Sequence, residues 1–191
     1  MSDVSHIGKK LRKLRTERGL DLATLAEMSR LDEDILHRLE SGHFLPSMAL
    51  ILKIARILDV RLGTFLDNDV EEYGVVVIRQ GNPKNEVSFA GAELEQRPRF
   101  DFHPLATDKK GRHMEPFLID VHPTGTRNHK FSTHEGEEFI YVLSGKLVIY
   151  HGNQRFSLSA GDSIYYDATV EHDIDAVDGD ARILSIIYTP S

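Results

Sequence analysis

Apolar residues recur at helical spacing from residue 7 to residue 66. Ile7, Leu11 and Leu14 open the pattern with basic residues between them, which is typical of one face of a helix. Gly19 can end this first helix and Asp21 can cap the next. The signals for the other helices are Asp32 and Gly42 for a third, Ser47 for a fourth and the run Leu62–Leu66 for a fifth. The pattern therefore predicts five short helices, and the second and third have the proportions of a helix-turn-helix.

Short apolar runs cut by glycine replace the helical period in the second half of the chain. Such runs at even spacing are typical of a β-sandwich or a small barrel. Gly145, Gly152 and Gly161 separate the clearest ones, which are Val142–Leu143, Leu147–Tyr150, Phe156–Leu158 and Ser163–Tyr166. Further strands are expected at Gly74–Arg79, Phe100–Phe102, Met114–Val121 and Ala181–Tyr188. The charged stretch Asp108–Arg112 is expected to be an exposed turn.

These two patterns indicate an α + β chain of two domains. We expect a helical domain over residues 1–66, a linker with the first strand or strands over 67–99, and a β domain over 100–191. The charges support this division. Residues 1–66 carry 11 basic and 9 acidic side chains, a balance of +2, so a net charge of −7 leaves −9 for the remainder. Such asymmetry between the two parts suggests that they have different partners.

Composition removes several classes of protein. The 191 residues include no cysteine, which excludes a disulfide framework, thiol catalysis and a cysteine–zinc site. No apolar run approaches the ~20 residues of a membrane span, and the N-terminus lacks the apolar core of a signal peptide. We therefore expect a cytoplasmic protein with no membrane partner.

Three potential metal ligands, His134, Glu138 and His172, lie in the β half. Two imidazoles and one carboxylate suit a divalent first-row metal, and one face of such ligands with open positions is typical of non-haem Fe(II) sites. Residues four apart on a straight strand lie ~13 Å apart, so the chain has to bend between His134 and Glu138. Gly136 permits that bend, which predicts a tight turn at Glu135–Gly136–Glu137. The alternative is that the histidines are ordinary loop residues and Glu138 is a solvated charge.

The same residues resemble the two motifs of the cupin family over roughly residues 115–189. Gly125, His134, Glu138 and Gly145 are similar to the first motif, and Gly161, Asp162 and His172 to the second. Two positions depart from the pattern, since Ser132 replaces the first histidine of the first motif and Glu171 replaces a proline. The resemblance implies a jelly-roll barrel in which His134, Glu138 and His172 would bind Fe, Zn, Mn or Ni, and His129 could substitute for the missing histidine, although its position does not match the motif. Many cupins hold a small organic ligand in the same cavity without a metal.

Residues 7–66 resemble the DNA-binding domains of the lambda-repressor and Xre type. The resemblance is carried by the apolar helix positions together with Arg15, Arg18, Gly19, Glu40, Gly42 and Pro46. It implies a five-helix bundle whose third helix enters the major groove of double-stranded DNA. The residues we expect at the DNA are Arg15, Arg30, Glu33, Asp34, His37, Arg38 and His43.

The acidic start of the third helix, Asp32–Glu33–Asp34, argues against close approach to phosphates, because DNA carries one negative charge per ~1.7 Å of axis. The basic run from Lys9 to Arg18 could bind phosphates instead. The simpler interpretation is that this run is a solvated helix face.

A helix-turn-helix domain followed by one cupin barrel resembles a class of bacterial transcription regulators. That resemblance implies a barrel that binds a small-molecule effector and usually dimerises the protein, and a homodimer would present paired reading helices to half-sites one turn apart. Strand alternation suggests aromatic residues for the effector pocket: Phe131, Tyr141, Tyr150, Phe156 and Tyr165.

The layout also resembles hydroxypropylphosphonic acid epoxidase, a mononuclear iron enzyme. The local likeness spans Phe117, Asp120–Val121, Lys130–Phe131 and the stretch from His134 to Gly145. This alternative implies an oxidoreductase with Fe(II) at His134, Glu138 and His172 and a vestigial helix-turn-helix. Phe102 and Leu105 stand where that family has substrate-binding tyrosines, which favours the regulator.

Overall fold

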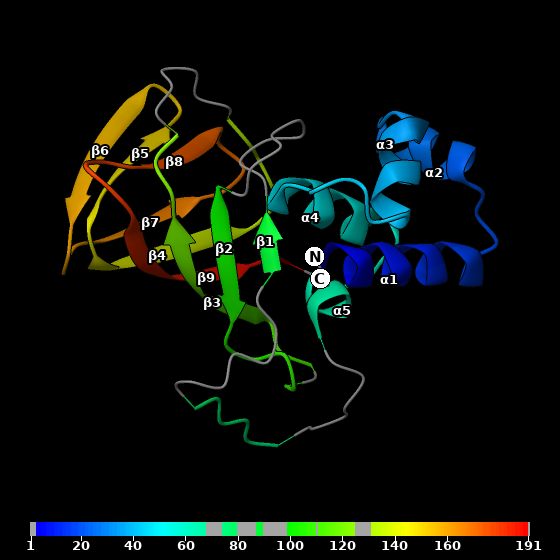
Figure 1. The fold of residues 1–191 in the computed structure, drawn as a ribbon, viewed down its shortest axis with the longest axis horizontal. Coiled ribbons are helices and arrows are strands. Elements are labelled where there is room, and N and C mark those ends of the chain that lie inside the picture. The colour runs from blue at the N-terminus through cyan, green and yellow to red at the C-terminus, as the bar shows by residue number, and fades with distance from the viewer. Residues whose placement is uncertain are drawn as a thin grey trace.

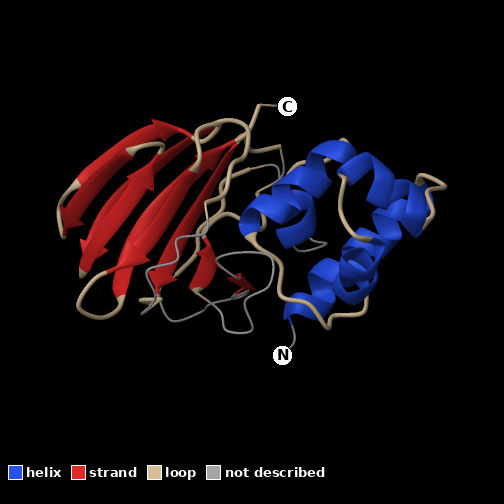
Figure 2. Ribbon diagram, turned by 90° about the horizontal axis from the view of Figure 1, so that it is seen from above, coloured by secondary structure: helices blue, strands red, loops and turns tan. Residues whose placement is uncertain are grey.

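The computed structural model describes residues 3–67, 74–79, 87–89, 99–109, 111–124 and 131–190. Figure 1 shows helices in the N-terminal part of the chain and strands in the C-terminal part. The two groups lie side by side, as Figure 2 shows from above. We call them the helical domain and the β domain. Gly125 and His129, which belong to the sequence expectations, lie outside the described residues.

The helices begin where the sequence offers a cap. Their bounds are α1 Asp3–Glu17, α2 Leu22–Ser29, α3 Glu33–Glu40, α4 Met48–Ile57 and α5 Gly63–Leu66. The three predicted caps are confirmed, because the side chains of Asp21, Asp32 and Ser47 accept hydrogen bonds from backbone N–H groups of the following helix, at 2.7, 2.8 and 3.2 Å. Such a cap contributes about 1 kcal/mol to helix stability.

The apolar stripe of each helix faces a common core in the helical domain. Ile7 and Leu11 of α1 are fully buried, as are Leu25 of α2 and Leu36 and Leu39 of α3. Burying one such side chain stabilises the fold by about 1.5–3 kcal/mol. The spacing of these residues therefore accounts for the bundle.

The β domain consists of two antiparallel sheets. A six-stranded sheet has the order β1-β2-β3-β9-β4-β7, and a three-stranded sheet has the order β6-β5-β8. The strands are β1 Val87–Phe89, β2 Phe100–Pro104, β3 Met114–Val121, β4 Glu137–Ser144, β5 Lys146–His151, β6 Gln154–Ser159, β7 Ser163–Asp167, β8 His172–Ala176 and β9 Ala181–Tyr188. The strands expected at Met114–Val121 and Ala181–Tyr188 are confirmed, and they pair with each other along their full length.

One expected strand is not found among the described residues. Val75–Arg79 is not a strand, and Val75 and Val77 are 87% and 64% exposed. An apolar run forms a strand only when its backbone pairs with another strand, and among the described residues neither sheet includes Val75–Arg79. Conversely, the sequence does not predict β8, because Asp173 and Asp175 interrupt its apolar pattern. The structure holds Asp173 by an ion pair with the buried Arg99 at 2.8 Å and Asp175 by Thr124 at 2.9 Å.

A buried ion-pair cluster joins the two domains. Arg112, just before β3, contacts Asp67 at the end of α5 at 2.5 Å and Glu115 of β3 at 2.7 Å. All three residues are buried, and Arg61 donates to the backbone carbonyl of Arg112 at 2.8 Å. The expectation of an exposed charged turn is therefore wrong for Arg112, because two carboxylates draw its guanidinium into the domain junction.

Gly63 allows this junction to close. A Cβ atom on Gly63 would lie 2.6 Å from Arg112 Nη2 and 2.8 Å from Glu115 Oε1, closer than carbon approaches these atoms. A second, exposed ion pair joins Arg56 of α4 to Glu135 of the β domain at 2.6 Å. The helical domain is thus fixed to one end of the β domain by charge as well as by apolar packing. Among the described residues, no helix is long and apolar enough to cross a membrane.

Candidate metal centre and nucleic-acid interface

The side chains of His134, Glu138 and His172 lie close together on the side of the β domain that faces the start of α4. Each offers one ligand atom, and these atoms all lie within 4.8 Å of one another. His172 Nε2 lies 3.9 Å from Glu138 Oε2, and the two imidazole rings are 5.2 Å apart. An ion sits about 2.1 Å from such ligands, so ligand atoms around it lie about 3–4 Å apart. The group is close to the geometry that a single ion requires.

The bend before β4 brings the three residues together. Gly136 has a positive φ of 97°, and a Cβ there would lie 1.8 Å from the carbonyl oxygen of Tyr188. No other residue fits that space. The structure has a bend at Glu135–Gly136, where the sequence predicts a change of direction, but Glu137 already belongs to β4 and not to the turn. On the other side, His172 is the first residue of β8 and exchanges two backbone hydrogen bonds with Ser132, at 2.9 and 3.0 Å.

Both histidines present Nε2 to the shared space. His134 Nδ1 lies 3.1 Å from the carbonyl oxygen of Glu135, and His172 Nδ1 lies 2.9 Å from that of Val170. A carbonyl oxygen accepts but cannot donate, so in the neutral ring Nδ1 carries the proton and Nε2 keeps its lone pair. Burial lowers the pKa of His134 below its ordinary value, which favours the neutral ring that a metal requires.

Glu138 is oriented by two hydroxyl groups. Tyr166 donates to Oε2 at 2.5 Å and Ser185 donates to Oε1 at 3.0 Å. Burial and the neighbouring Glu138 carboxylate raise the pKa of Tyr166 well above its ordinary value, so its hydroxyl stays protonated as a donor. Groups that hold ligands in this way are a regular part of metal sites. The donor types, the free Nε2 atoms and the oriented carboxylate fit a divalent ion with open coordination positions.

A small chamber surrounds the three residues and opens toward the helical domain. Its volume is about 70 Å³. Its apolar walls include Phe102, Ile119, Ile174, Ile183 and Ile187, and Ser47, Met48 and Ala49 at the start of α4 also line it. A wider cleft of about 970 Å³ lies between the domains.

The second surface of interest is the exposed face of α3. Glu33, Asp34, His37 and Arg38 are all exposed there, and His43 just after α3 and Arg30 just before it are exposed as well. The acidic residues at the start of α3 stabilise the helix itself. Asp32 caps the helix, and Glu33 and Asp34 lie in its first turn, where negative charge is stabilised by the helix dipole.

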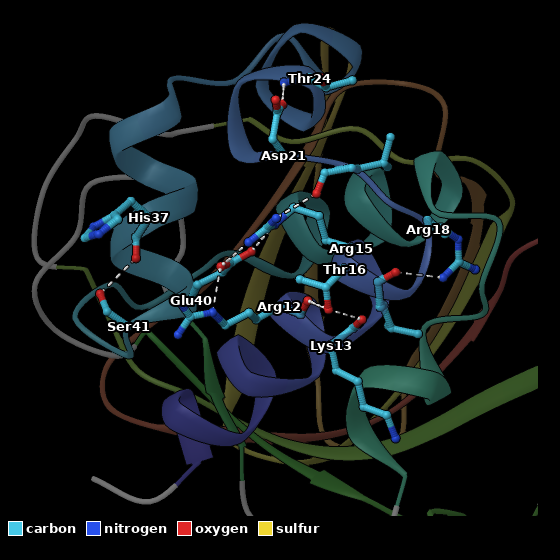
Figure 3. A network of polar contacts seen from close by, with 12 residues as sticks. Arg12, Lys13, Arg15, Thr16, Arg18, Asp21, Thr24, His37, Glu40 and Ser41 are labelled. Atoms are coloured by element: carbon cyan, nitrogen blue, oxygen red, sulfur yellow. Dashed lines mark hydrogen bonds and ion pairs between the residues drawn. The ribbon is translucent and has the colours of Figure 1, made fainter.

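Arg15 does not belong to this surface. Its guanidinium donates to both carboxylate oxygens of Glu40, at 2.6 and 2.9 Å, and to the carbonyl oxygen of Leu20 at 2.7 Å. Figure 3 shows this network between α1 and α3. The expectation that Arg15 contacts DNA is wrong, since the buried carboxylate of Glu40 holds it inside the bundle.

The other basic residues of α1 are likewise either exposed or bound to the protein's own backbone. Lys9 and Lys13 are exposed. Lys10 donates to the backbone carbonyl of Asp67 and so helps to hold the end of α5. Arg18 folds back onto the carbonyl oxygen of Leu14 at 3.1 Å (Figure 3).

Comparison with known proteins agrees with both halves of this description. The sequence matches the helix-turn-helix family over residues 11–65 and the cupin domain family over residues 117–187. The chain joins a helix-turn-helix domain to a cupin domain. The helical domain is hereafter called the helix-turn-helix domain, and the β domain the cupin domain.

Known proteins share this layout along nearly the whole chain. The HTH-type transcriptional regulator PuuR of Escherichia coli (strain K12) is 22% identical over 185 residues, covering 96% of this chain and 95% of that protein. The structure of an HTH_3 family transcriptional regulator from Vibrio cholerae is similar with a TM-score of 0.73 and 24% identity, covering 99% and 98% of the two chains. Hydroxypropylphosphonic acid epoxidase from S. wedmorenis is similar with a TM-score of 0.50 and 21% identity, covering 98% and 99%. These structural similarities concern the fold.

The aromatic residues expected in the effector pocket lie mostly elsewhere. Tyr141, Phe156 and Tyr165 are exposed by 40%, 37% and 61%, so their placement in the pocket is wrong. Tyr141 alternates with the buried Ile140 and Val142 along β4 and therefore points outward. Phe131 lines the wide interdomain cleft, and the half-buried Tyr150 packs against it at 6.4 Å between ring centroids.

Sequence reasoning missed Tyr166 and Ser185, the two residues that orient Glu138. Tyr166 is the direct cross-strand partner of Glu138 in the register of β4 and β7. Strand alternation alone would have placed either Tyr165 or Tyr166 inside, and only the register selects Tyr166.

The burial of Glu115 at the domain junction could have been predicted from the sequence, since Glu115 shares the inward face of β3 with Phe117 and Ile119. A carboxylate in that position requires a partner.

Proposed function

We propose that this protein is a DNA-binding transcription regulator whose cupin domain binds a small-molecule effector. The observation that carries the proposal is the helix-turn-helix geometry of α2 and α3, with α3 capped at its start and exposed along one side. Two similar proteins, matched along nearly their whole length, are named as transcription regulators. A homodimer, with two α3 helices reading half-sites one turn apart, suits this geometry.

The DNA contacts of the proposal come from the exposed side of α3 and its flanks. Arg38 and His37 offer donors to base edges or phosphates, and Arg30 and His43 extend the same surface. Glu33 and Asp34 would accept from cytosine amino groups, and Asp34 also lies 3.8 Å from Arg38, which offsets part of its charge.

Charge reversal on α3 tests this assignment. In the proposal, Arg38→Glu weakens binding to duplex DNA about tenfold or more, because it removes a donor and places a carboxylate against the DNA. The control is Arg182→Glu, which changes charge equally but lies on the cupin sheet in an ion pair with Asp120. Fluorescence anisotropy with labelled duplex measures both. Equal losses for the two variants would contradict a role for α3.

We further propose that His134, Glu138 and His172 hold a divalent metal that anchors the polar end of the effector. When bound, the ion would supply Lewis acidity and open coordination positions. The chain's own residues set the site: His134 and His172 present Nε2, and Tyr166 and Ser185 fix the carboxylate. Elemental analysis should find about one ion per chain, lost in His172→Ala and kept in His43→Ala. Retained stoichiometric metal in His172→Ala would refute the assignment.

A mononuclear iron oxidoreductase is the second candidate. It is favoured by the same two-histidine, one-carboxylate group, which leaves positions for substrate and oxygen. Oxygen consumption by the Fe(II)-loaded protein with candidate phosphonate or carboxylate substrates separates the two functions. Turnover that is lost in His172→Ala, together with no measurable DNA binding, would select the enzyme.

A further inference from the structure

The chamber around His134, Glu138 and His172 and the cleft between the domains adjoin each other. Both spaces are lined by Ser47, Ala49, Ser132 and His134. Two of these four residues, Ser47 and Ala49, belong to the helix-turn-helix domain. The boundary between the chamber and the cleft therefore includes the start of α4.

The volumes of the two spaces are very different. Sites for small organic molecules usually measure about 300–1,000 Å³. The chamber measures about 70 Å³, enough for an ion and a few small groups, whereas the cleft measures about 970 Å³. A small organic molecule with one end at His172 must therefore extend past Ala49 into the cleft, or displace α4.

Both ends of α4 make polar contacts. Ser47 caps the helix through the backbone N–H of Leu50, and Arg56 near its end forms an ion pair with Glu135 across the cleft. In the other direction, α4 packs on α2 within the helix-turn-helix. A displacement of α4 would thus be passed to the helices that are proposed to meet DNA.

We propose that the effector site is shared between the domains, with the first turn of α4 as its roof. The ligand class is an amphipathic small molecule with a compact polar end at His134, Glu138 and His172 and a body in the cleft near Ala49 and Phe131. Filling this site changes the position of the helix-turn-helix domain relative to the cupin domain. The regulatory consequence rests on the proposed function, whereas the shared site is a statement about structure alone.

Substitution at Ala49 tests the roof even though the effector is unidentified. The chain has no cysteine, so Glu17→Cys on α1 and Ser157→Cys on β6 give two exposed spin-label sites, one in each domain. Double electron–electron resonance, with excess unlabelled protein to remove contacts between copies, then reports the interdomain distance. The series Ala49→Ser, Ala49→Leu and Ala49→Trp fills the junction progressively. Ala23→Trp on the exposed side of α2 is the matched control.

We expect Ala49→Ser to keep the wild-type distance and Ala49→Trp to change it by more than about 2 Å, the scale of helix shifts in switching proteins. Ala49→Leu should lie between them, and Ala23→Trp should leave the distance unchanged. An unchanged distance in Ala49→Trp, or an equal change in Ala23→Trp, would overturn the shared site. Failure of DNA binding would overturn the proposed function while leaving these distances interpretable, so the two failures are distinguishable.

Discussion

Removal of Arg112 should uncouple the two domains. In Arg112→Met the side-chain volume is largely kept, but Asp67 and Glu115 remain buried without their guanidinium partner. Removing one member of a buried ion pair costs about 3–5 kcal/mol. Arg112 also donates to the backbone carbonyl of Lys109 at 2.7 Å, and that carbonyl would lose its partner too. We expect a loss of unfolding free energy in this range.

A second arginine offers a control with matched geometry. Arg182 binds both oxygens of Asp120, at 2.6 and 2.7 Å, but its side chain is 49% exposed whereas that of Arg112 is 7% exposed. Exposed ion pairs contribute about 0.2–1 kcal/mol. Arg182→Met should therefore cost several-fold less than Arg112→Met, although the change in chemistry is the same.

Urea unfolding followed by circular dichroism measures both variants. In Arg112→Met we expect an earlier transition that separates into two, because the domains no longer stabilise each other and two-state behaviour is lost. Burial already raises the pKa of Glu115, and loss of Arg112 removes the charge that opposes this. A carboxyl group with a raised folded-state pKa contributes stability at low pH that is lost as pH rises. The deficit should thus be larger at about pH 8 than at about pH 5. If Arg112→Met costs no more than Arg182→Met, the account of the junction is wrong.

Three further predictions concern the metal site, a histidine just after β3 and α1. Tyr166→Phe removes a hydroxyl that orients the carboxylate of the metal site, and isothermal titration should show about 10–100-fold weaker metal binding; unchanged affinity would exclude the orienting role. The hydrogen bond that His122 Nε2 donates to the carboxylate of Asp101 raises the pKa of His122. The stabilisation by His122 is therefore present below its unfolded pKa of about 6.5 and is lost as pH rises through the folded value. His122→Gln should therefore lower the urea midpoint at about pH 5.5 more than at about pH 8.5, and equal shifts would contradict this. If α1 contacts phosphates, Lys9→Gln with Lys13→Gln should reduce the salt dependence of DNA binding by about 0.9 per lost contact, and an unchanged slope would exclude those contacts.

Local signals in the sequence are sufficient for the helices and most of the strands. The caps at Asp21, Asp32 and Ser47 depend on a side chain and a backbone group only two or three residues away. They can therefore be predicted from the sequence without knowledge of the fold. The same holds for the bend at Gly136. The strand expected at Gly74–Arg79 but not formed shows the limit, since β-branched residues form a strand only when their backbone pairs with another strand, and the sequence of the run does not reveal that pairing.

The contacts that the sequence does not reveal join residues far apart in the chain. The resemblance to lambda-repressor-type domains implies a DNA contact for Arg15 on α1, yet Glu40, far along the chain, determines its position. Arg112 is expected in solvent for the same reason, and Asp67 draws it inward. The three ligands of the metal site can be named from the sequence, but the residues that orient them require the register of β4, β7 and β9.

Selection of bound sequences from a random pool of duplex DNA tests the central proposal most directly. The selection uses purified protein at moderate salt and works although the target sequence is unidentified. We predict enrichment of a convergent motif with two-fold symmetry, whose half-sites lie about one helical turn apart, and loss of that enrichment with Arg38→Glu. A pool that stays random after repeated rounds, with the protein folded and metal-loaded, would contradict the regulator and favour the iron enzyme.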